Sequence, residues 1–224
     1  MMEIIPYGSH ALLINFEKKI DSTIHSLVMS YFHLLEKFPE VSYQIPAYCS
    51  ITVGYDPAAI NYHQLKEKIE NTKVDMNRSK AGSKVIEIPV CYAHDFAPDL
   101  EEVSKRLKLN PEEIIRMHTA EIYDVYMMGF LPGFPYLGKL PKALECARKS
   151  TPRKQVKAGS VGLAGSQTGI YPSVAPGGWQ LIGQTPIHLF NPSKNNSFLI
   201  KVGNRIKFKS IDADEFEKIA HNGK

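Results

Sequence analysis

The stretch that determines the fold is residues 150–186, STPRKQVKAGSVGLAGSQTGIYPSVAPGGWQLIGQTP. Its short apolar runs are separated by turn-forming residues, and none of them keeps the 3.6-residue period of a helix. Ten of the 15 glycines of the chain lie between Gly129 and Gly183, so the backbone turns often there. Short strands joined by closely spaced turns predict a β-barrel or a β-sandwich.

The preceding segment, MGFLPGFPYLGKLP (Met128–Pro141), combines three glycines and three prolines with Phe130, Phe134 and Tyr136. An exposed loop does not need these aromatic residues, and a regular strand does not tolerate the prolines. Fixed backbone angles together with aromatic bulk make a stiff apolar surface, which suits ligand pockets and protein interfaces alike. We predict a rigid rim where the barrel meets a ligand and a partner subunit.

The first third of the chain predicts a small α+β domain over residues 1–78. A strand is expected at 10–17, a helix from Asp21 or Ser22 up to Pro39, two strands within 41–56, and a helix opened by a capping box of Asn61 and Gln64. This order of elements predicts a ferredoxin-like sandwich of helices on one sheet. The polar stretch 71–84 is the predicted linker.

The second domain is predicted over residues 85–224. It begins with the strand KVIEIPV, and two helices follow, one from Asp99 and one from Asn110-Pro111. We expect a further strand at EIYDVYMM, a hairpin in SFLIKVGNRIKFK with its turn at Gly203-Asn204, and a short helix over Asp214–Ile219.

Composition and charge exclude several classes of protein. The three cysteines of the 224-residue chain lie far apart, which argues against a disulfide framework and a zinc site. The net charge is only +4 and no long basic stripe is present, which argues against a nucleic-acid-binding protein. We find no signal peptide and no apolar run of about 20 residues, the length that spans a bilayer. The expectation is a cytoplasmic protein that contacts neither membrane nor nucleic acid.

Three long motifs carry a family resemblance: GFLPGFPYLGKLP, TPRKQVKAGSVGLAGSQTGIYP and PGGWQLIGQTP. In this order and spacing they resemble the allophanate hydrolase subunit 1 family, which includes KipI and the B subunit of the bacterial ATP-dependent 5-oxoprolinase. The likeness extends to HALLINFE, IPAYCSITVGYDP and PDLEEVSKRLKLNPEEIIRMHTA, and so covers nearly the whole chain. It implies a cyclophilin-like β-barrel after the amino-terminal α+β domain.

The resemblance also implies an activity and partners. The partners would be an allophanate hydrolase subunit 2, which is the KipA-like C subunit, together with a LamB/YcsF-like A subunit. The complex would open the lactam of 5-oxoproline to L-glutamate, with ATP and Mg used by the complex and no cofactor bound by this chain alone. The alternatives are a KipI-type inhibitor of a sensor histidine kinase, an allophanate or urea amidolyase subunit, and a prolyl isomerase suggested by fold alone.

Some positions depart from the family pattern. Ala93, His94 and Ala97 stand where relatives commonly have glycine, and Ser166 stands where many have another glycine. A side chain at a position that needs positive φ would strain the backbone. These changes remove no chemical group, so they question the local geometry and not the family.

Two residues are the candidates for catalysis. His118, in IIRMHTAE, is either a proton shuttle with a near-neutral pKa or a buried histidine that donates to a backbone carbonyl. Arg153, in TPRKQ, either grips a carboxylate or a phosphorylated intermediate or belongs to a solvated basic face with Arg148, Lys149 and Lys157. The other seven histidines have no metal-ligand spacing, so we predict no metal.

The remaining candidates are uncharged. Gln167 and Thr168 offer donors and acceptors that suit an amide substrate. Trp179, the only tryptophan, is either a flat wall against a ligand or a core anchor. The predicted substrate-binding set is Phe130, Phe134, Tyr136, Gln167, Thr168, Tyr171, Trp179 and Gln180. The sequence has no GxxxxGK[ST] phosphate loop, so we expect catalytic groups to be shared across subunits.

Overall fold

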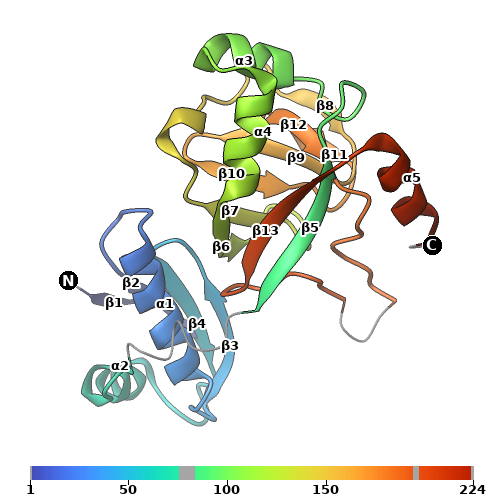
Figure 1. The fold of residues 1–224 in the computed structure, drawn as a ribbon. Helices are drawn as coiled ribbons and strands as arrows, with labels where there is room; N and C mark the ends of the chain where they lie inside the picture. The colour runs from blue at the N-terminus through green and yellow to red at the C-terminus, as the bar shows by residue number, and fades with distance from the viewer. Residues whose placement is uncertain (1, 76–83, 194–196, 223–224) are drawn as a thin grey trace. The chain divides into compact units, whose positions relative to one another are not determined.

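The chain folds into two compact units, Met1–Ser83 and Lys84–Lys224. The structure is a computed structural model that describes residues 2–75, 84–193 and 197–222 (Figure 1). Most of the predicted linker, residues 76–83, lies outside the described residues.

The amino-terminal unit is a four-stranded antiparallel sheet with two helices on one face. Its elements are β1 (Glu3–Pro6), β2 (Ala11–Asn15), α1 (Ser22–Leu35), β3 (Val41–Pro46), β4 (Ser50–Tyr55) and α2 (Tyr62–Asn71). The predicted caps are confirmed: Thr23 N donates to Asp21 at 2.9 Å, and Asn61 and Gln64 form the capping box. The core lies between the helices and the sheet face that carries Leu12, Ile14, Ile51 and Val53.

The sheet order β1-β2-β4-β3 contains one strand that the sequence pattern did not predict. In a ferredoxin-like fold the edge strand beside the first strand follows the second helix. Here that place beside β2 is taken by β1, from the beginning of the chain, with Ile4 paired to Ile14. The four residues of β1 are too few to show a clear alternation, which explains the omission.

The carboxyl-terminal unit is built around a closed barrel, which is one of the two alternatives predicted from residues 150–186 and the one that the family resemblance implied. Its strands run in the order β10-β7-β6-β13-β5-β12-β9, and β10 pairs with β9 to close the ring. Their bounds are β5 (Val85–Cys91), β6 (Ile122–Met128), β7 (Pro135–Gly138), β9 (Ser160–Ala164), β10 (Gln167–Ile170), β12 (Gln180–Gln184) and β13 (Arg205–Ile211). A separate pair, β8 (Arg153–Val156) and β11 (Ala175–Gly177), lies outside the ring.

Helices pack against the barrel and contribute residues to its hydrophobic core. Figure 1 shows α3 (Leu100–Leu107) and α4 (Pro111–Ala120) beside the barrel, and α5 (Ala213–Asn222) follows β13. The predicted start of α4 is confirmed, because Asn110 and Glu113 form a capping box ahead of Pro111. Asp99 precedes α3 but makes no side-chain cap bond, which leaves its carboxylate for other partners.

The predicted hairpin at residues 197–209 is wrong. Only its second half is a strand, β13, and this strand pairs in parallel with β5 and antiparallel with β6. The turn is present, since Gly203 has φ of +80° and Asn204 N donates to Lys201 O. The barrel offers β13 two long-range partners, and these pairings replace the local one.

The departures from the family glycines cause no backbone strain. None of Ala93, His94, Ala97 and Ser166 is among the described residues with positive φ. Beside Ser166 it is Gly165, at +59°, that takes the left-handed conformation.

Lys108, the carboxyl-terminal cap of α3, holds a left-handed conformation (φ 56°, ψ 39°) that favours glycine. We expect Lys108→Gly to raise the free energy of unfolding by about 0.5–1 kcal/mol. The strain that it relieves in the folded state exceeds the conformational entropy that glycine adds to the unfolded chain. Lys105→Gly inside the same helix should instead lower it by about 1 kcal/mol. Urea unfolding of both variants tests the pair, and a loss of stability in Lys108→Gly would contradict it.

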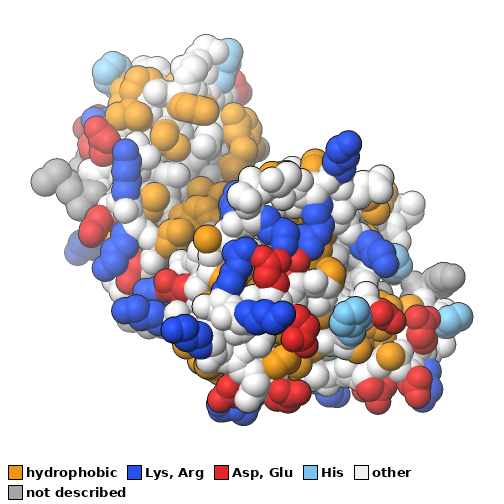
Figure 2. Space-filling view, turned by 90° about the horizontal axis from the view of Figure 1, so that it is seen from above, with side chains coloured by type: hydrophobic (Ala, Val, Ile, Leu, Met, Phe, Trp, Pro, Cys, Tyr) orange, Lys and Arg blue, Asp and Glu red, His pale blue; other side chains and the backbone are white. Residues whose placement is uncertain are grey.

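Charged side chains of both signs are interspersed on the face shown in Figure 2. Within the described residues, no helix is long and apolar enough to cross a bilayer.

Candidate functional site

A buried carboxylate, Asp99, organises the charged groups of the barrel unit. Asp99 is 2% exposed, and its Oδ1 accepts from Arg153 Nη2 at 2.5 Å and from Lys149 Nζ at 3.0 Å. Its Oδ2 accepts from the backbone N–H of Leu181 at 2.7 Å, while Asp99 N donates to Leu181 O. The carboxylate therefore fixes the start of α3 to β12 and holds Arg153 on β8.

The electrostatics of this cluster favour its ionised form. Burial alone raises the pKa of Asp99, but hydrogen bonds from Arg153, Leu181 N and Lys149 outweigh it, so the net pKa lies below the ordinary 3.8. Hydrogen bonds to Glu102 and then to Asp99 raise the pKa of Lys149. The cluster is thus fully charged at neutral pH, and its stabilising effect is lost only as the pH falls below about 4.

The aromatic residues of the three motifs form one cluster against the outside of the barrel. Phe134 contacts Trp179, Tyr171 and Tyr136 with ring centroids 5.5, 5.1 and 4.8 Å apart. Phe134, Tyr171 and Trp179 are at most 5% exposed, so they are the floor of this surface and not a free wall. Tyr136 is half-buried at its edge.

Phe130 is the exposed member of this aromatic cluster. It is 57% exposed and has φ of +68°, an uncommon conformation for an aromatic residue. Its ring stands edge-on to Phe134 at 5.6 Å and to Tyr171 at 6.4 Å. The glycine–proline segment therefore turns so that one of its aromatic side chains is presented to solvent.

His118 lies in the barrel interior, with no exposed surface. Its Nδ1 is 2.8 Å from Tyr92 Oη, and its Nε2 is 3.0 Å from Thr168 Oγ1, which also donates to Gly162 O. One proton arrangement satisfies all of these groups: Tyr92 donates to Nδ1, and Nε2–H donates to Thr168. Burial lowers the pKa of His118 to about 3, so the ring is neutral.

This placement corrects two of the predicted site residues. A histidine with both nitrogens bonded in the core does not reach a substrate, so we assign His118 a structural role and not that of a proton shuttle. Thr168 is likewise fully buried as its partner. The sequence pattern placed His118 on the buried face of α4 with Ile114 but could not show what faced it.

Two predicted amide side chains are also buried. Gln180 has no exposed surface and donates to Ala147 O at 3.0 Å, and Gln167 is 9% exposed on β10. Of the ten predicted residues, the exposed or half-buried ones are Phe130, Tyr136 and Arg153.

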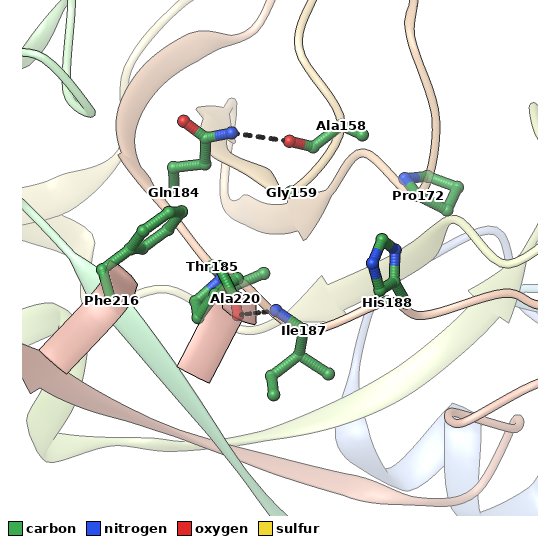
Figure 3. A pocket seen from close by; sticks show the side chains of 10 residues that line it. Ala158, Gly159, Pro172, Gln184, Thr185, Ile187, His188, Phe216 and Ala220 are labelled. Atoms are coloured by element: carbon green, nitrogen blue, oxygen red, sulfur yellow. Dashed lines mark hydrogen bonds between the residues drawn. The ribbon is translucent and has the colours of Figure 1, made fainter. Parts of the chain in front are cut away.

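A pocket of about 250 Å³ lies elsewhere on the barrel unit, and sequence reasoning missed it (Figure 3). It is lined by the turn at Gly159, by Gln184, Thr185 and His188, and by Phe216 of α5. Gln184 donates to Ala158 O at 2.7 Å, and Thr185 N donates to Gly159 O. Two of the family motifs, KAGSVG and GQTP, therefore meet at this pocket, where they fix its backbone.

Neither a group of metal ligands nor a disulfide is present in the described part of the chain. No group of three or more His, Cys, Asp or Glu residues there is placed to hold a metal ion. Cys49, Cys91 and Cys146 are free thiols, and burial raises the pKa of Cys91 and, to about 11, that of Cys146.

Comparison with known proteins identifies the family. The family described as carboxyltransferase domain, subdomain C and D, matches residues 2–200. This chain belongs to that carboxyltransferase family. Its curated relatives include the 5-oxoprolinase B subunit of Bacillus subtilis (41% identical, over 96% of this chain and 95% of the relative) and that of Haemophilus influenzae (36%, over 92% and 97%).

Several solved structures share the fold. TTHA0988 superposes with a TM-score of 0.81 and 32% identity over 91% of this chain, which spans only 40% of that longer protein. PH0987 from Pyrococcus horikoshii is 38% identical over 96% of this chain and all of its own, with a TM-score of 0.59. The urea amidolyase of K. lactis, at 16% identity and a TM-score of 0.72, shows the fold alone.

The residue that sequence reasoning on this carboxyltransferase module missed is Asp99. An aspartate before a helix is read by default as its cap, and nothing local indicates a bond to a residue 54 positions away. Only the packing of α3 on β12 brings it to Arg153.

Proposed function

We propose that this chain is the B subunit of an ATP-dependent 5-oxoprolinase, which opens the lactam of 5-oxoproline to L-glutamate. The observation that carries the proposal is the 41% identity to the B subunit of Bacillus subtilis over nearly the full length of both chains. The partly exposed Arg153 and the aromatic cluster beside it supply a cation and an apolar floor, which a compact acidic ring requires.

We further propose that the chain is inactive alone. Its partners are the C subunit, which is KipA-like, and the A subunit, which is LamB/YcsF-like, and ATP with Mg binds elsewhere in the complex. Two observations support a shared site: the sequence lacks a phosphate-binding glycine loop, and three aromatic side chains of the cluster are too buried to enclose a ligand by themselves.

The test is reconstitution of the three purified subunits with ATP and Mg, with glutamate formation from 5-oxoproline as the measurement. We expect turnover with all three subunits and none with this chain alone. No turnover by the complete complex would contradict the assigned function, and full turnover by the isolated chain would contradict the shared site.

In the same assay, Arg153→Ala should lower kcat/KM for 5-oxoproline by about 10–100-fold, the effect of losing one charge-assisted hydrogen bond. Lys154→Ala is the matched control, because Lys154 is an exposed neighbour on β8 and should leave kcat/KM unchanged. Co-elution of the subunits must show that the complex is intact. Equal activity of the two variants would remove Arg153 from the site.

A further inference from the structure

We propose that Arg148 and Arg153 form a subsite for the carboxylate of a small ligand at the edge of the aromatic cluster, and that Asp99 positions Arg153 in it. The inference rests on the proposed function, in which 5-oxoproline brings such a carboxylate. Arg148 and Asp99 have no place in the site predicted from sequence. Both enter it through contacts of the folded barrel unit.

The basic segment 148–153 runs along three consecutive residues, 177–179. Arg153 is the strand partner of Gly177, and Lys149 N donates to Gly178 O at 2.7 Å. The guanidinium carbon of Arg148 lies 5.8 Å from the ring centroid of Trp179. The two arginines therefore flank the same short stretch of chain, one from β8 and one from above the indole.

Glycine at 177 brings this stretch against Tyr171. A Cβ at Gly177 would lie 2.2 Å from Tyr171 Oη. Burial raises the pKa of Tyr171, while the backbone N–H of Trp179, Arg148 and Arg153 each lower it, so both arginines act on this one hydroxyl. Arg148 has the same opposing effect on the pKa of the half-buried Tyr136. The positive potential of the two arginines thus converges on the edge of the aromatic cluster.

The charges there leave capacity for an anion. Lys149 is paired with both Asp99 and Glu102, whereas Arg153 shares only Asp99 Oδ1. Arg153 Nη1 is buried and has no hydrogen-bond partner among the described residues, and Arg148 has no ion pair with any of them. An enclosed donor without a partner costs free energy, which a carboxylate oxygen would recover.

Asp99 is suited to position the arginine because it is itself fixed. Its Oδ2 is held by Leu181 N, so its Oδ1 grips Nη2 of Arg153 from a defined direction and leaves Nη1 for a second acceptor. A guanidinium fork binds carboxylates with two parallel hydrogen bonds, and the aromatic cluster would receive the apolar part of the ligand. The chemistry selected is a small carboxylate on a compact apolar ring.

The experiment compares 5-oxoproline with its primary amide, 5-oxoprolinamide, which has the same lactam ring and no negative charge. Calorimetry measures the Kd of each compound for the full chain alone and for the chain mixed with its KipA-like and LamB/YcsF-like partners, without ATP. We expect the acid to bind at least 10-fold more tightly than the amide in one or both preparations. A ratio near one in both, or no binding of the acid, would overturn the proposal.

Four variants locate the effect. Arg153→Ala should weaken binding of the acid alone and so bring the ratio of the two Kd values, amide over acid, near one. Arg148→Ala, at an exposed residue, should lower this ratio by about 3–10-fold. Asp99→Asn should lower the ratio while the amide still binds as before, a change that general loss of structure would not produce. Glu102→Gln, which removes a carboxylate that pairs with Lys149 but not with Arg153, is the matched control and should keep the ratio.

The outcomes separate this proposal from the function on which it rests. If the complex forms glutamate but does not distinguish acid from amide, the subsite is wrong and the function stands. If the acid is preferred through Arg153 but no glutamate forms, the subsite stands and the function is wrong.

If Asp99→Asn does not fold, Arg148→Ala still decides, since an unchanged ratio in it overturns the two-arginine subsite. If Arg153→Ala weakens assembly of the complex and not acid binding, the arginine pairs with a protein carboxylate, and the proposal is overturned.

Discussion

Replacing His118 with alanine is expected to lower the free energy of unfolding of the carboxyl-terminal unit by about 3–5 kcal/mol. The ring fills the barrel interior, where it stacks on Phe208 at 4.4 Å, so its removal leaves a cavity. It also leaves the hydroxyl of Tyr92, a buried residue that is only 5% exposed, without its acceptor. The free-energy costs of the cavity and of the unpaired hydroxyl add together, which makes this the largest single effect that we predict.

Trp179 provides the measurement, because it is the only tryptophan and lies in the barrel unit. Its fluorescence during urea unfolding reports this unit and not the amino-terminal one. His188→Ala is the matched control, since His188 is exposed and its loss should change the unfolding free energy by less than about 0.5 kcal/mol. Similar midpoints for both variants would contradict the structural role of His118.

The same histidine makes stability depend on pH. The pKa of His118 is lowered from 6.5 to about 3, so between these values the unfolded chain binds a proton that the folded chain does not. Stability therefore falls as the pH drops from 6.5 towards 3, by up to about 1.4 kcal/mol per pH unit. His118→Gln keeps a donor and an acceptor but does not titrate. The dependence of the unfolding free energy on pH should therefore lose the contribution of one proton, up to about 1.4 kcal/mol per pH unit. An unchanged slope would show that other groups cause it.

Gly159→Ala is expected to destabilise the barrel unit by about 3 kcal/mol. Gly159 has φ of +80°, and a Cβ there would lie 2.2 Å from the backbone oxygen of Thr185. That oxygen belongs to the turn at the pocket, where Thr185 N donates to Gly159 O, so neither segment can move away without breaking a hydrogen bond. Left-handed strain and a backbone collision act together.

Gly165→Ala separates the two causes. Gly165 also has positive φ, +59°, but a Cβ there meets nothing within 4 Å. Its substitution should cost only the left-handed strain, about 1 kcal/mol. The difference of about 2 kcal/mol between the variants, measured by Trp179 fluorescence in urea, is the collision at Thr185. Equal costs would mean that the turn relaxes freely.

Local sequence signals determined much of the secondary structure. The capping boxes of α2 and α4 and the proline at the start of α4 formed as expected, because such signals act within three or four residues. The glycine-rich stretch predicted closely turned strands, and these closed into the barrel. The short β1 and the false hairpin before β13 mark the limit of such signals, since distant partners decide strand pairing.

The sequence by itself determined the family, through its motifs, and the residues with chemical capacity. Its local pattern predicted a barrel or a sandwich, and the family resemblance implied the barrel. Only the tertiary structure decided which of these residues are available. It buried His118 and Thr168 in one closed hydrogen-bond network and left Arg153 half-exposed. It also turned Asp99 from an apparent helix cap into the partner of that arginine. The physical reason is that side-chain partners and burial depend on contacts between segments far apart in the chain, which no local pattern records.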